Sequence, residues 1–137
     1  MKLASRERYS YRRSVGDKTE IGWLSEPEEH NYPAAESYLG LIYDGPATAK
    51  LVAGLRRAPV STFKAKDIFR ASGLSLLGVS NAHVAKDQKK IKDGKKLSPL
   101  LLVRDPGRGK VVVADGYHRL CAVYSFDEDA QIPCKIA

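Results

Sequence analysis

The 137-residue sequence has few of the features that assign a chain to a functional class at once. No apolar run approaches the roughly 20 residues of a membrane-spanning helix, and no hydrophobic segment follows the basic N-terminus as in a secretory signal. Walker phosphate loops, dinucleotide-binding fingerprints and Cys-x-x-Cys pairs are missing. His30, His83 and His118 are too scattered for a metal site to be inferred from spacing. These absences predict a cytoplasmic protein without a membrane partner.

Cysteine is scarce as well, with only Cys121 and Cys134 in the chain. Each lies in an apolar stretch, which is typical of a buried and reduced thiol in an intracellular protein. A chain of this length can bury an adequate hydrophobic core without disulfides or metal. We therefore expect both cysteines to be buried, unbridged and dispensable for activity.

Acidic residues are outnumbered, because 23 lysines and arginines face 16 aspartates and glutamates, a formal net charge of +7. The positive charge is concentrated in a tail over residues 1–20 and in the stretch from Lys86 to Lys96. Such a charge favours nucleotides, phosphorylated small molecules or nucleic acid as partners. The tail has few large aliphatic residues and is predicted to be flexible. Both basic segments are candidate nucleic-acid contacts, although a solvated tail and a solvated helix face are the simpler interpretation.

The remaining chain divides into two parts by its hydrophobic pattern. Residues 21–58 predict a helical hairpin extension, with helices at 34–43 and 47–57 separated by the turn Asp44-Gly45-Pro46. Residues 59–137 predict one α+β domain. Its expected elements are a short strand at 60–64, a helical turn at 66–71, a helix at 82–92 capped by Asn81, strands at 99–103, 110–114 and 132–136, and a helix at 117–126.

The turn at residues 115–119 has a composition suited to binding an anion and moving a proton. The strand at 110–114 stops at Asp115-Gly116 and passes directly into a helix, whose free N–H groups attract anions. Gly116 permits close approach of a ligand to the backbone. His118 and Arg119 lie in the first helical turn, where they can bind the same anion; His118 can also move a proton. Asp115 has three alternative roles: it could bind a metal, accept a proton from a substrate hydroxyl, or cap the helix.

The segment LSPLLLVRDPGRGKVVVADGYHRLCAVYSFDEDAQIPCKI resembles the core of the ParB/sulfiredoxin superfamily. That family has a Pro-led strand, a glycine turn, a second strand, a Gly-x-x-Arg phosphate-binding turn, a helix, and a final strand beginning Ile-Pro. The matching turn is Gly116-Tyr117-His118-Arg119, and the resemblance covers roughly the last two-fifths of the chain. It implies a ParB/sulfiredoxin-like α+β fold with a small mixed sheet. It also implies a phosphate or nucleotide site at this turn, with Asn81 and His83 facing it from the opposite side.

The branches of that superfamily imply different activities. Sulfiredoxins carry a catalytic cysteine where Tyr117 stands here, so sulfinic acid reductase activity is not expected. Chromosome-partitioning members bind CTP and continue into a helix-turn-helix region; the printed sequence stops at Ala137, so we expect no such DNA reader. Free serine kinases, which use ADP, carry Asp-Gly-His-His-Arg, and the turn from Asp115 to Arg119 differs from it at one position.

The kinase branch also requires an upstream catalytic glutamate, which this sequence does not clearly supply. No glutamate occurs between residues 37 and 127. The candidates by position alone are Glu26, Glu28, Glu29 and Glu36.

Taken together, the resemblance implies a nucleotide- or phosphate-binding ParB-like protein, with phosphotransferase or nucleotide hydrolase activity as one form of it. Asp115 and His118 are then the candidate catalytic residues, Asp115 the candidate Mg²⁺ ligand, and ADP, ATP or CTP the candidate nucleotides. Two alternatives stay open: a DNA-associated partition- or nuclease-like protein without its own helix-turn-helix, and a non-catalytic nucleotide-sensing module. The sequence indicates no oligomeric state.

Overall fold

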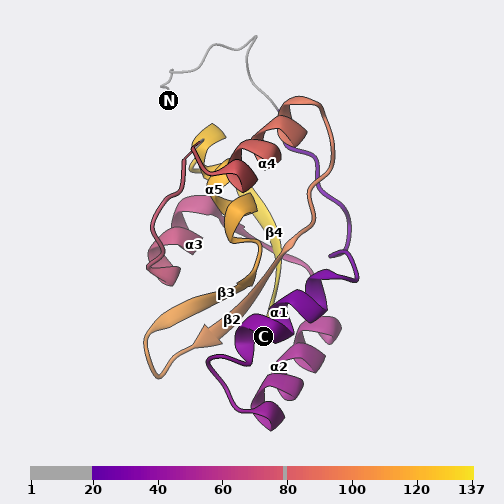
Figure 1. Ribbon diagram of the computed structural model, residues 1–137, viewed down its shortest axis with the longest axis vertical. Helices are drawn as coiled ribbons and strands as arrows, with labels where there is room; N and C mark the ends of the chain where they lie inside the picture. Colours follow the sequence, from indigo (N-terminus) through magenta and orange to yellow (C-terminus); the bar gives the residue numbers. More distant parts are fainter. Residues whose placement is uncertain (1–19, 79) are drawn as a thin grey trace.

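The computed structural model describes residues 20–78 and 80–137, so the basic tail predicted at 1–20 lies almost wholly outside the described residues. The elements in that part of the chain are α1 (Asn31–Leu39), α2 (Gly45–Arg57), β1 (Ser61–Lys64), α3 (Ala65–Ser72), α4 (Ala82–Lys92), β2 (Leu100–Asp105), β3 (Lys110–Asp115), α5 (Tyr117–Phe126) and β4 (Gln131–Ile136) (Figure 1). None of these helices is long and apolar enough to cross a membrane.

The four strands form one mixed sheet in the order β1-β4-β2-β3. The outer pairs β1–β4 and β2–β3 are antiparallel, whereas the central pair β2–β4 is parallel. The predicted α+β class is therefore confirmed, and the strands predicted at 99–103, 110–114 and 132–136 lie in one sheet, although the first begins at Leu100. The helices predicted at 82–92 and 117–126 have those bounds in the structure.

β2 is the central constraint of the fold because both of its faces are buried. Leu100 and Leu102 point into one hydrophobic core, and Leu101 and Val103 point into the other. This alternation follows from the two-residue period of a strand. Each of the four side chains is at most 2% exposed. A strand covered on both faces explains why its sequence reads as an unbroken apolar run.

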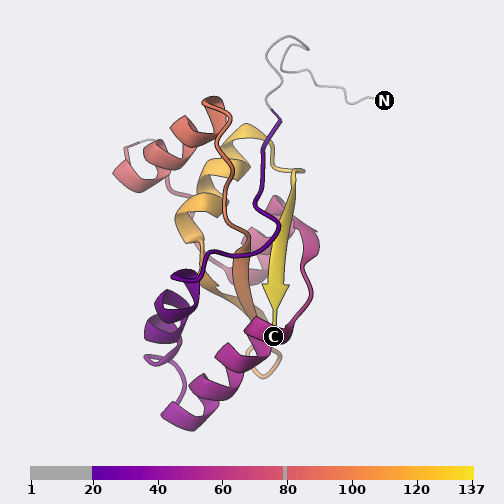
Figure 2. The same ribbon diagram turned by 90° about the vertical axis from the view of Figure 1, so that its right-hand side faces the viewer.

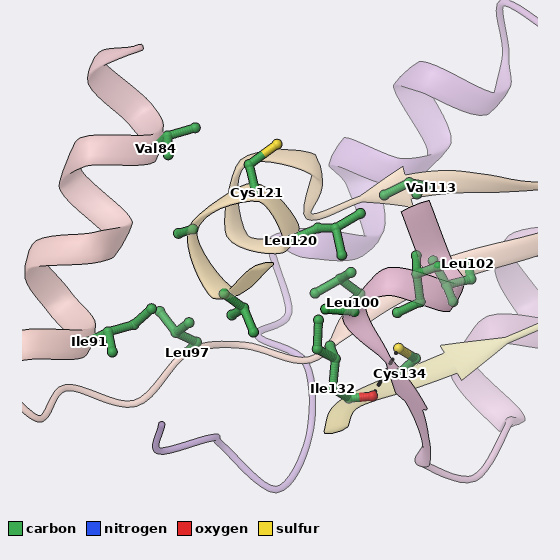
Figure 3. Close-up of a cluster of buried hydrophobic side chains, with 14 residues drawn as sticks. Val84, Ile91, Leu97, Leu100, Leu102, Val113, Leu120, Cys121, Ile132 and Cys134 are labelled. Atoms are coloured by element: carbon green, nitrogen blue, oxygen red, sulfur yellow. Dashed lines mark hydrogen bonds between the residues drawn. The ribbon is translucent and has the colours of Figure 1, made fainter. Parts of the chain in front are cut away.

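The first core lies between the sheet and helices α3, α4 and α5. Leu120 of α5 packs with Leu100 and Ile132 of the sheet, and Val84 and Ile91 place α4 against the same cluster (Figure 3). In both ribbon views α4 and α5 lie side by side, at the end of the molecule opposite to α1 and α2 (Figure 2). This core holds the helix that follows the Asp115-Gly116 turn.

The second core lies on the other face of the sheet, under α1 and α2. Its buried residues are Tyr32, Ala35, Leu39, Val52, Leu55, Leu101, Val103, Val112 and Ala114. Asp44 begins α2 by accepting a hydrogen bond from Ala47 N at 2.8 Å. α1 starts at Asn31 and ends at Leu39, so both ends lie earlier than in the helix predicted at 34–43. Pro33 occupies its first turn, where a missing N–H is harmless.

The segment before α1 contacts the chain just before β2 and, through Glu26, the end of β4. Leu24 N donates to Leu97 O at 2.8 Å, and Leu97 N donates to Gly22 O at 2.9 Å. Lys135 of β4 is 5% exposed and donates to Arg56 O at 3.0 Å while its Nζ lies 3.1 Å from Glu26. Burial alone would lower the pKa of Lys135, but hydrogen bonding to Glu26 and Tyr32 outweighs it and raises that pKa.

Both cysteines are free and buried, as expected. Cys134 Sγ lies 3.2 Å from Ile132 O, and burial raises the pKa of Cys134 to about 12. Burial also raises the pKa of Cys121, although Leu77 N donates to its sulfur at 3.4 Å.

We expect neither thiol to react with a thiol-specific reagent in the folded protein. The thiolate is the reactive form; burial raises the pKa of both thiols and so lowers the thiolate fraction, and it also keeps the reagent away from the sulfur atoms. Labelling of the native protein should therefore stay slow and nearly constant from pH 7 to pH 9. Labelling in urea should be fast and rise with pH across the same range. Rapid native labelling of either cysteine would contradict the burial described here.

Candidate functional site

The predicted turn lies where β3 passes into α5. Gly116 is the N-cap residue of α5, with a left-handed φ of 111°, and it makes no side-chain cap hydrogen bond. The first helical bond runs from Leu120 N to Gly116 O at 2.9 Å. Asp115 therefore does not cap the helix, which removes one of its three alternative roles. The backbone N–H groups of Tyr117, His118 and Arg119 have no acceptor among the described residues.

A β-bulge directly precedes the turn. Leu102 pairs with Val113, but Leu101 pairs with Asp115, so Ala114 has no partner directly opposite on β2. A bulge bends and twists a strand locally and changes where the next side chain points. Val113 and Ala114 belong to opposite cores, so strand alternation places Asp115 on the α5 side, where its carboxylate contacts Arg119.

Gly116 is required by the protein's own packing. A Cβ atom at this position would lie 2.7 Å from Leu100 Cγ and 2.9 Å from Arg119 Nη2. The positive φ would add backbone strain to any side chain. The structure thus accounts for the glycine through contacts with Leu100 and Arg119, without a ligand.

Asp115 and Arg119 form an ion pair inside the turn. Arg119 Nη2 donates to Asp115 Oδ2 at 3.0 Å and to Pro99 O at 3.4 Å. The side chains are 17% and 19% exposed for Arg119 and Asp115 respectively. Arg119 Nε is buried and has no hydrogen-bond partner. An unsatisfied buried donor costs about 1–3 kcal/mol, so this guanidinium has a donor that a further acceptor would satisfy.

His83 and His118, from the first turns of α4 and α5, lie next to each other. The rings of His83 and His118 lie 4.8 Å apart between centroids with a tilt of 36°, and the rings of Tyr117 and His118 lie 5.6 Å apart. Further along, Gln88 Nε2 donates to Ser125 Oγ at 2.6 Å, so α4 and α5 run in the same direction. Both helices therefore point their positive N-terminal ends to one place.

Asn81 has the structural role that the sequence favoured. Its Oδ1 accepts hydrogen bonds from His83 N at 2.9 Å and Val84 N at 3.2 Å, which caps α4. Its carboxamide oxygen is thus already used within the protein. A direct contact from Asn81 to a ligand stays a prediction from the resemblance.

Sequence reasoning missed the partner of Tyr117. Its hydroxyl donates to the carbonyl of Ser75, in the segment between α3 and α4. Burial, together with the nearby Cys121, raises the pKa of Tyr117. The acceptor is a main-chain carbonyl distant in sequence, so no side-chain pattern marks it. Tyr117 can offer a ligand its backbone N–H, while its hydroxyl is already bonded.

The described residues do not build a metal site around Asp115. They contain no group of three or more His, Cys, Asp or Glu side chains that could hold a metal ion. The candidate glutamates are engaged elsewhere: Glu26 lies 3.1 Å from Lys135, and Glu29 lies 2.7 Å from Arg56. No contact in the described part of the chain brings a glutamate to the turn.

The chain matches no protein-family model, no curated protein and no solved structure. The likeness to the ParB/sulfiredoxin superfamily therefore stays an expectation from the sequence.

We expect Gly116→Ala to reduce the free energy of unfolding by about 2–4 kcal/mol, through backbone strain and the clash with Leu100. Urea denaturation would measure the loss. Gly45→Ala is the matched control, because an added Cβ there meets nothing within 4 Å. Equal stability of Gly116→Ala and the wild type would show that the turn packs differently.

Asn81→Ala should lower the free energy of unfolding by about 1 kcal/mol, because α4 loses its N-cap. Asn81→Asp should restore that stability, since aspartate caps equally well. If Asn81→Ala instead kept full stability, the capping role would be refuted. Thermal and urea unfolding of the three proteins would decide.

Proposed function

We propose that this chain is a ParB-like protein that binds a phosphate group of a nucleotide, or of a related small molecule, at the N-terminal end of α5. The main support is that three consecutive backbone N–H groups lack acceptors in the same turn where Arg119 Nε is buried without a partner. A phosphate has several acceptor oxygens and is attracted by a helix N-terminus. One phosphate could satisfy donors that the described protein atoms do not.

Each residue of the turn has a distinct part in this proposal. The N–H groups of residues 117–119 bind phosphate oxygens, and Gly116 sets the backbone that presents them. His118 and His83 approach from the two helix ends and donate from their imidazoles. Both hydrogen bonds of Arg119 to described residues use Nη2, which leaves the rest of its guanidinium for the ligand.

Long-range electrostatics also support an anionic ligand. α4 and α5 are parallel, so their dipoles add at the site. Lys86 is exposed one turn beyond His83, and further lysines follow on the same helix. The exposed lysines are also the observation that favours the second candidate, a DNA-associated protein. Purely electrostatic DNA binding weakens steeply with salt. DNA affinity that persists at physiological salt would therefore favour the DNA-associated function, and its loss would favour the phosphate-binding function.

The proposal extends from phosphate binding to catalysis at the same turn. In a phosphotransferase or nucleotide hydrolase, Asp115 or His118 would move the proton of the attacking hydroxyl or water. Asp115 is held by Arg119 Nη2 at the turn, so its carboxylate would lie beside the bound phosphate while remaining paired. Mg²⁺ enters only as the ion that accompanies the phosphates of ADP, ATP or CTP. A module that binds the nucleotide without turnover is the non-catalytic form of the same proposal.

We expect His118→Ala to weaken nucleotide binding by about 10- to 150-fold, the equivalent of a charge-assisted hydrogen bond of about 1.5–3 kcal/mol. Calorimetric titration with ADP, ATP and CTP, each with Mg²⁺, would measure the affinities. His83→Ala should weaken binding in the same direction. His30→Ala is the matched control, because His30 is exposed, its imidazole lies 3.9 Å from Glu28, and no contact among the described residues links it to the turn.

Asp115 and Arg119 need a paired test, because Arg119→Ala alone leaves a mostly buried carboxylate without its partner. Asp115→Asn should keep most of the affinity and lose turnover if Asp115 moves a proton. The double variant Asp115→Asn with Arg119→Ala then reports the loss of the guanidinium without the unpaired charge. Wild-type affinity in that double variant and in His118→Ala would make the turn a purely structural helix start.

A further inference from the structure

The outer edge of β3 is an unpaired strand edge. β3 pairs only with β2, so the outward N–H and C=O groups of residues 110–115 have no strand partner in the described chain. The side chains of Val112 and Val113 are buried on the two faces of the sheet, and Lys110 lies exposed at the end of the strand. The opposite edge, β1, has only four residues. Natural sheets normally protect an open strand edge, so an unpaired edge of six residues indicates an interaction surface.

A groove of about 260 Å³ lies over this edge. Residues 110–113 line it along the strand, Tyr38 and Ile42 line it from α1, and Ser72 and Leu74 from the end of α3. Arg108 of the β2–β3 hairpin is at one end. In Figure 1 this hairpin reaches out from the body of the molecule, with β3 outermost. The groove thus has the sheet edge as its floor and a wall from each face of the sheet.

The walls carry exposed apolar side chains. Tyr38 is 45% exposed and Leu74 is 36% exposed, although both are large and hydrophobic. Burying Tyr38 and Leu74 against a partner is favourable, and exposed apolar side chains along a groove are typical of a binding site. Leu41 and Leu76 are 85% and 53% exposed but do not line the groove.

The charge at the groove selects the partner. Lys110 is exposed, lines the groove and forms no ion pair with a described residue. Arg108 is held by Asp105, with 2.8 Å between Nε and Oδ2. The whole chain carries a formal net charge of +7. An acidic side chain at the Lys110 end of the groove is therefore favoured, whereas a second copy of this basic chain is not.

We propose that the edge of β3 binds an extended segment of a partner protein, which adds a fifth strand to the sheet. Main-chain hydrogen bonds to β3 supply the register, apolar side chains of the segment contact Tyr38 and Leu74, and an acidic side chain pairs with Lys110. This surface does not depend on phosphate binding at the α5 turn, so either proposal can fail alone.

The test uses the full chain and short synthetic peptides that alternate valine with threonine and carry one glutamate. Titration followed by amide NMR should shift the resonances of residues 110–115. A peptide with lysine in place of glutamate should bind roughly two- to fivefold more weakly. Lys110→Glu should reverse that preference, and Lys50→Glu, an exposed change on α2, should leave it unchanged.

Backbone pairing needs its own control. Two further peptides carry N-methyl groups on alternate residues, one set on each edge of the strand, because N-methylation removes N–H donors and adds bulk. Strand addition predicts that one set binds and the other does not. Leu74→Ser should weaken the binding of the unmethylated peptide, whereas Leu41→Ser, outside the groove, should not.

Several results would overturn the proposal. The first is an absence of shifts at residues 110–115 with every peptide. The second is equal binding of the two methylated sets, which would indicate apolar contact without pairing. The third is a concentration-dependent dimer in sedimentation that Lys110→Glu abolishes, because the groove would then be occupied by a second copy.

Discussion

The burial of β2 on both faces is the constraint on which the rest of the structure depends. Leu100 and Leu102 join the sheet to α3, α4 and α5, while Leu101 and Val103 join it to α1 and α2. Large-to-small changes at such positions typically cost 2–5 kcal/mol, a large share of the stability of a small domain. β3 and β4 are both positioned by pairing with β2. Through β3, this strand also fixes where the Asp115-Gly116 turn lies.

At the turn, packing and the proposed phosphate binding would use the same atoms. Leu100 Cγ and Arg119 Nη2 fill the space beside Gly116, and Arg119 Nη2 also donates to Asp115 at the end of β3. A helix N-terminus attracts anions, but an unpaired Asp115 carboxylate beside it would repel them. The ion pair with Arg119 neutralises that carboxylate. Asp115 is thus compatible with a phosphate site only because Arg119 is paired with it. This arrangement makes the ion pair, and not Arg119 alone, the unit on which ligand binding would act.

The sequence predicted most of the elements because their signals are local. The bounds of α4 and α5 follow from Asn81 as an N-cap and from the break at Asp115-Gly116. The cysteines were correctly expected to be buried and free because their neighbours are apolar.

What the sequence could not supply are contacts between distant segments. The hydrogen bond from Tyr117 to the Ser75 carbonyl, the strand order and the ion pair between Lys135 and Glu26 depend on tertiary packing. The capping alternative for Asp115 was wrong because a glycine with positive φ occupies the N-cap.

The two proposed sites are connected by a single strand. The edge groove includes residues 110–113, and the phosphate turn begins at Asp115, so β3 carries both. Leu74 lines the groove, while the neighbouring Ser75 carbonyl accepts the hydrogen bond from Tyr117 in the turn. A segment bound along β3 would therefore restrict two features that position the α5 N-terminus. Reciprocity of coupling then requires that any effect of the segment on phosphate affinity equal the effect of phosphate on affinity for the segment.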